Sequence, residues 1–82
     1  MKDIELERAV VAILWNLGDV FIRESVLTSE TEIRLRRGLA AADFRAAIDS
    51  LRSAKLLAKD VDPYGEALYS LTPAGREAAR RA

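Results

Sequence analysis

The stretch LLAKDVDPYGEALYSLTPAGR, residues 56–76, decides the fold of this 82-residue chain. Apolar residues on both sides of an Asp-Pro-Tyr-Gly turn have strand character, and Pro63 and Gly65 supply the turn chemistry. We therefore expect a β-hairpin whose strands contain Leu57, Val61, Leu68, Tyr69 and Leu71. Thr72 is placed to cap a following helix, and Pro73 suits the first helical position.

Apolar residues that recur at helical spacing predict further helices on both sides of this stretch. Residues 3–17 form the first helix, and Gly18 ends it. Its inner face is expected to hold Leu6, Val10, Ile13, Leu14 and Leu17. Residues 39–54 form the clearest helix, with an inner face of Phe44, Ala47, Ile48, Leu51 and Ala54. A short helix over residues 73–81 completes the set.

The segment between the two longer helices has two interpretations. In the preferred one, residues 21–30 form a short helix capped by Asp19, and residues 32–36 form a strand that pairs with the hairpin. The inward residues of this short helix would be Phe21, Ile22, Val26 and Leu27. The strand is favoured because residues 32–36 alternate polar and apolar side chains. In the other interpretation, the second helix continues to Arg37.

Cysteine and histidine are both absent from the sequence. Their absence excludes disulfides and thiolate metal sites, and it removes the commonest general base and metal ligand. The serines therefore have no histidine to activate them, and the isolated glycines form no phosphate-binding loop. Asp60, Asp62 and Glu66 lack the spacing of a calcium loop. We expect no enzyme activity, catalytic residue, metal or cofactor.

Hydropathy and charge limit the partners. The apolar run of residues 9–15 is too short to span a bilayer, and acidic residues precede it, so we expect a cytoplasmic protein without a membrane partner. The net charge is zero, but residues 1–33 carry three basic and seven acidic side chains. Residues 34–59 carry seven basic and two acidic side chains, which makes the middle of the chain basic.

A helix that ends just before a hairpin, followed by Leu-Thr-Pro-Ala-Gly-Arg at residues 71–76, resembles the winged-helix DNA-binding domains of MarR- and PadR-type bacterial regulators. This resemblance implies an α+β, mostly α fold in a single domain over residues 1–82. The domain would have a three-helix core, a β-hairpin wing and a short C-terminal helix. The resemblance also implies that the third helix, about residues 40–54, enters the major groove of double-stranded DNA beside the wing.

Such a recognition helix contacts DNA through its exposed face. The candidates on that face are Ala42, Arg45, Ala46, Asp49 and Arg52. Arg45 suits a bidentate contact with guanine, the alanines permit close approach or a contact with a thymine methyl group, and Asp49 can accept from cytosine. Arg52 would contact bases or phosphates. The alternative is a solvated helix face.

Three more arginines, Arg34, Arg36 and Arg37, precede this helix and could hold DNA phosphates. Their alternative roles are ion pairs with nearby acids or a solvated edge. In the hairpin, Lys59 is a further candidate for a DNA contact. The other charged residues at its tip are the acidic Asp60, Asp62 and Glu66, which disfavour insertion of the wing into DNA.

A second apolar stripe, Ile4, Val11 and Trp15, lies on the first helix opposite its core face. The preferred interpretation is that the C-terminal helix covers this stripe with Ala74, Ala78 and Ala79. The alternative is a homodimer seam or another partner face, as the resemblance implies.

Two functions follow from these features. The favoured one is a small bacterial or phage transcriptional regulator that binds DNA, without an identifiable small-molecule effector. The alternative is a winged-helix protein-interaction module without DNA binding, which the acidic wing and the zero net charge favour.

Overall fold

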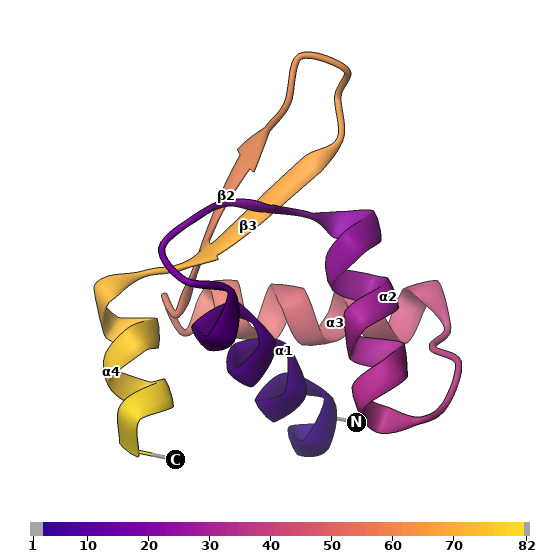
Figure 1. Cartoon of the computed structure of the whole chain (residues 1–82), viewed down its shortest axis with the longest axis horizontal. Coiled ribbons are helices and arrows are strands. Elements are labelled where there is room, and N and C mark those ends of the chain that lie inside the picture. The colour runs from indigo at the N-terminus through magenta and orange to yellow at the C-terminus, as the bar shows by residue number, and fades with distance from the viewer. Residues whose placement is uncertain (1–2, 82) are drawn as a thin grey trace.

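The computed structural model describes residues 3–81, and Met1, Lys2 and Ala82 of the predicted domain lie outside the described residues. Figure 1 shows a body of four helices from which a hairpin projects. The helices are α1 (Ile4–Leu17), α2 (Glu24–Leu35), α3 (Ala41–Ser53) and α4 (Pro73–Arg81). The strands are β1 (Ile22–Arg23), β2 (Leu57–Val61) and β3 (Ala67–Leu71). None of the helices within residues 3–81 is long and apolar enough to cross a membrane.

The three strands form one antiparallel sheet in the order β1-β3-β2. Strand β3 pairs with β2 from Leu57↔Leu71 to Val61↔Ala67, and with the short β1 at Ile22↔Tyr69. The predicted hairpin is confirmed, and Gly65 in its turn has a positive φ. Side chains alternate between the two faces of a sheet, so Lys59 shares a face with its register partner Tyr69.

The core lies between α1, α2, α3 and the base of the hairpin. Its buried apolar side chains are Leu6, Val10, Ile13, Leu14, Leu27, Phe44, Ala47, Ile48, Leu51, Leu57, Tyr69 and Leu71. The predicted inner face of the third helix is confirmed except at Ala54, which is exposed. Likewise, Leu17 of the first helix is exposed rather than buried.

The predicted strand over residues 32–36 is wrong. These residues belong to the end of α2 and its cap, and the third strand lies earlier, at Ile22–Arg23. Leu27, Thr31 and Leu35 recur every four residues on the inner face of α2, whereas Ile33, which the alternation places inward, is 70% exposed. The buried Thr31 hydroxyl donates to the carbonyl of Leu27 at 2.7 Å, which satisfies it in the core.

The predicted beginning of the second helix is also wrong. The helix begins at Glu24, and Asp19 pairs with Arg76 instead of capping it. Phe21 and Val26, which were expected inward, are about half exposed. The end of the helix agrees better with the second interpretation, since Arg36 ends it in a left-handed conformation with φ 58°.

The beginning of α4 is built as the sequence predicts. The Thr72 hydroxyl accepts from the Gly75 N–H at 3.0 Å and donates to the Lys55 carbonyl at 2.7 Å. The Thr72 N–H donates to the Leu56 carbonyl at 3.1 Å. These bonds join the start of α4 to the corner between α3 and β2, with Gly75 packed directly on Leu56.

Candidate nucleic-acid interface

The outer side of α3 carries the residues that the sequence proposes for DNA contact. All five of them, Ala42, Arg45, Ala46, Asp49 and Arg52, are exposed. Arg45 and Arg52 are seven residues apart, so they lie two turns apart on the same flank, and Asp49 lies between them. The buried stripe of α3 faces α1 and the hairpin base, which leaves this flank to solvent.

Three cations from two elements, α3 and β2, lie around Tyr69 of the hairpin. Arg45 and Arg52 both act electrostatically on the phenol of Tyr69, and Lys59 lies opposite Tyr69 on the same sheet face. We call Arg45, Arg52 and Lys59 the cationic corner. Within residues 3–81 none of the three forms an ion pair, so their charges are available to an anionic partner.

Tyr69 joins the hairpin to the start of α2 beneath this corner. Its hydroxyl donates to Oε1 of Glu24 at 3.1 Å. Burial first, and then the carboxylate of Glu24, raises the pKa of Tyr69 to about 12, although Arg52 and Arg45 act in the opposite direction. The phenol therefore stays neutral near pH 7, and its hydrogen bond joins β3 to α2.

The acidic residues of the wing are used for internal bonds. Glu66 accepts at Oε2 from the Ser25 hydroxyl at 2.7 Å and from the Ser25 N–H at 3.1 Å, and so caps α2 from the hairpin. The Ser25 hydroxyl bond is the largest cause that lowers the pKa of Glu66. Asp62 accepts at Oδ1 from the N–H groups of Tyr64 and Glu66, both at 2.9 Å. These two carboxylates thus have structural roles.

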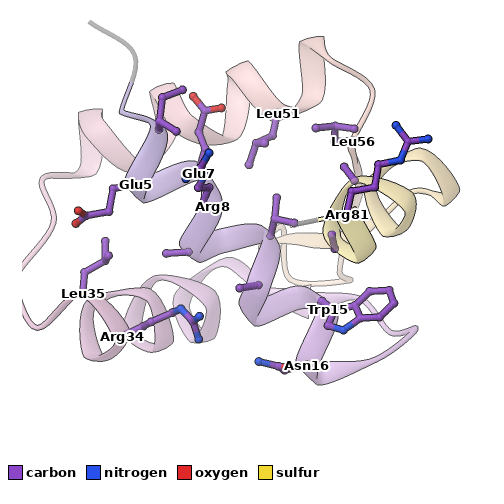
Figure 2. Close-up of a pocket in the computed structure, with 16 residues that line it drawn as sticks. Glu5, Glu7, Arg8, Trp15, Asn16, Arg34, Leu35, Leu51, Leu56 and Arg81 are labelled. Carbon is purple, nitrogen blue, oxygen red and sulfur yellow. The ribbon is translucent and has the colours of Figure 1, made fainter.

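The three arginines that precede α3 do not form one group. Arg37 pairs with Asp3, the N-cap of α1, at 3.2 Å, instead of with Glu30 or Glu32. Arg34 lies on α2 beside α1, among the residues that line a groove along α1 (Figure 2). Arg36 remains exposed at the turn before α3, without an ion pair among the described residues. Arg34 belongs to α2 and Arg36 is its C-cap, so the two do not lie on a strand.

A groove of about 1070 Å³ follows α1 between α2 and α4. Figure 2 shows Arg34 on the α2 side of α1 and Arg81 on the α4 side. Of the predicted stripe, Val11 is packed against the core, while Ile4 and Trp15 remain 48% and 44% exposed. The predicted cover is therefore incomplete: Ala79 packs against the core, but Ala74 and Ala78 are exposed.

No group of three or more acidic side chains within residues 3–81 is arranged to hold a metal ion. The contacts that sequence reasoning missed are those of Glu24 with Tyr69 and of Ser25 with Glu66, which join residues 45 and 41 positions apart. No local pattern indicates pairs so distant in sequence.

Comparison with known proteins identifies the fold. No family model matches the sequence, and no curated protein matches it either. A transcriptional regulator of the MarR family from Silicibacter pomeroyi has a TM-score of 0.77 and 23% identity, over 94% of this chain and 47% of its own. F93 from STIV, a winged-helix DNA-binding protein, has a TM-score of 0.73 and 21% identity, over 98% of this chain and 86% of its own.

The present chain thus spans about half the length of the MarR-family regulator. The expected α+β, mostly α winged-helix fold is confirmed.

Proposed function

We propose that this chain is a small transcriptional regulator of bacterial or phage origin that binds double-stranded DNA in the cytoplasm. In this proposal the exposed flank of α3 enters the major groove. The chain acts as a single domain and has no enzyme activity. The observation that carries the proposal is the cationic corner, where three unpaired cations lie beside the flank of α3. The winged-helix fold supports it, since both similar structures are described as a transcriptional regulator or a DNA-binding protein.

The roles of the other predicted residues follow from their positions. Ala42 and Ala46 would allow α3 to approach the base edges, and Asp49 would accept from cytosine. Arg36 would add a phosphate contact at the turn before α3. Arg34 and Arg37 no longer belong to the proposed interface, because one lines the groove and the other is paired with Asp3.

A salt titration with random-sequence duplex DNA tests the proposed function. We expect fluorescence anisotropy to show binding at low salt. The slope of log affinity against log salt concentration should be about −3, because three to four phosphates would be neutralised and each contributes about −0.9 to the slope. Absence of binding at low salt would contradict the proposal.

A second function, docking of a protein partner, is favoured by the groove beside α1, where Ile4 and Trp15 are half exposed. A second copy of the chain is one such partner, and the homodimer remains a prediction. A light-scattering mass of the free protein distinguishes a dimer from the 9.1 kDa monomer.

A further inference from the structure

Four side chains of α1 form a stripe along the groove beside this helix. They recur at spacings of four, three and four residues, which places them on one face of the helix: Ile4, Arg8, Val11 and Trp15. We call them the outer stripe of α1. Ile4 and Trp15 remain 48% and 44% exposed, although α2 and α4 contribute to the same groove. The outer stripe is about 17 Å long at 1.5 Å per residue, which is three turns of helix.

The walls of this groove are helices. Figure 2 shows α1 with α2 on one side and α4 on the other. Backbone groups inside a helix are bonded to each other, so these walls offer no row of free N–H and C=O groups to an extended strand. An extended partner would therefore bury its own backbone groups without hydrogen bonds. A helix satisfies its backbone internally, so the groove favours a helical partner of about three turns.

The charges of the groove indicate an acidic partner. Arg8 and Arg34 line it, are exposed and form no ion pair within residues 3–81. A third arginine, Arg81, forms an ion pair within its own helix. Of the two acidic side chains in the lining, Glu7 is buried and Glu5 is exposed. The exposed charge of the groove is therefore positive, and a partner with carboxylates beside its apolar face would complement it.

A second copy of the chain complements this stripe less well. In a two-fold dimer built on the outer stripe, α1 of one copy would pair with α1 of the other. If the two helices are antiparallel, with Ile4 beside Trp15, the two copies of Arg8 lie within one turn of each other. If the helices are parallel, the two copies of Arg8 lie side by side. In either direction like charges meet, so the charge of the groove favours a different, acidic chain.

We propose that the groove beside α1 binds an acidic amphipathic helix of another protein. The apolar side chains of that helix pack on Ile4, Val11 and Trp15, and its carboxylates pair with Arg8 and Arg34. None of these residues belongs to the flank of α3 or to the cationic corner, so the helix and DNA do not compete for the same side chains. The inference rests on the second function proposed above, docking of a protein partner, and it names the chemistry of that partner.

The fluorescence of Trp15 tests this inference in the full chain, because it is the single tryptophan of the sequence and lies in the groove. The probes are two synthetic peptides of about 14 residues, cross-linked to stay helical because short isolated helices are marginal in water. Both carry the same stripe of leucines and no aromatic residue, and the flanking residues are glutamate in one and lysine in the other. We expect the acidic peptide, at up to about 1 mM, to shift the emission of Trp15 to shorter wavelength. The basic peptide should leave the emission unchanged.

Two double variants with the same net charge locate the binding. Arg8→Ala with Arg34→Ala should weaken binding of the acidic peptide about fivefold or more, since two ion pairs are lost. Arg45→Ala with Arg52→Ala changes the flank of α3 instead, and should bind the peptide like the parent. All four arginines are exposed, so neither variant should alter folding, and both keep Trp15 as the reporter.

The inference is overturned if the acidic peptide leaves the emission of Trp15 unchanged, if the basic peptide binds as well as the acidic one, or if the two double variants bind the acidic peptide equally. The light-scattering mass then separates its failure from failure of the second proposed function. A dimer, or binding of the basic peptide, keeps protein docking and removes the acidic helix. A monomer that binds neither peptide contradicts both.

Discussion

Replacing Arg45 and Arg52 together with alanine is expected to weaken binding of random duplex DNA by about 30-fold or more, or about 2 kcal/mol. Both guanidinium groups lie on the exposed flank of α3 and have no ion-pair partner within residues 3–81. Their loss should also reduce the salt slope by about 1.8, because two phosphate contacts disappear. Anisotropy titrations of the parent and the variant at several salt concentrations measure both quantities.

A charge-matched control separates location from net charge. The double variant Arg8→Ala, Arg34→Ala removes two exposed arginines that line the groove beside α1, so both double variants carry the same net charge. The control should bind nearly as well as the parent. Equal losses in the two variants would mean that only total charge matters, and the assignment of the interface to α3 would be wrong.

Gly75→Ala is expected to destabilise the protein by about 2 kcal/mol or more. In an exposed helix the same change would normally stabilise by up to about 1 kcal/mol, since alanine is the better helix former. Here a methyl group would overlap the carbonyl oxygen of Leu56 and lie 3.1 Å from both its carbonyl carbon and Cδ2 of Leu71. The backbone of Leu56 cannot move away without breaking the hydrogen bond that the Thr72 N–H donates to the same carbonyl. Urea denaturation followed by circular dichroism measures the difference.

Gly38→Ala is the matched control for this change. A methyl group there would meet Oε2 of Glu32 at 3.7 Å, which is ordinary contact distance, and the position does not require a positive φ. We expect its free energy of unfolding to stay within about 0.5 kcal/mol of the parent. A stability gain in Gly75→Ala would show that α4 does not pack on Leu56 as described.

The predictable parts of the fold are those in which local chemistry and burial agree. Thr72 and Pro73 start α4 as expected, and Pro63 with Gly65 forms the turn. The prediction for the end of the second helix is wrong in part because the buried stripe of this helix includes the polar Thr31. A polar residue at that position interrupts the apolar period of four residues between Leu27 and Leu35. Strand β1 has two residues, too few to show any periodicity.

The residues of the candidate site on α3 could be predicted from the sequence, whereas those contributed by other elements could not. Arg45 and Arg52 follow from the periodicity of one helix, which fixes their common flank. The prediction grouped Arg34 with them because it is close in sequence, whereas in the structure Arg34 lines the groove beside α1. Lys59 joins the two arginines through the register of β2 with β3, which tertiary packing rather than local sequence positions against α3.

The position of the bound DNA, measured by NMR on the amide groups of the isotope-labelled protein with a short random-sequence duplex, tests the central claim most directly. We expect the largest shift changes along the exposed flank of α3 and at Lys59, with the amides of the groove beside α1 unchanged. Shift changes concentrated around Trp15 and α4, with α3 unaffected, would contradict the account.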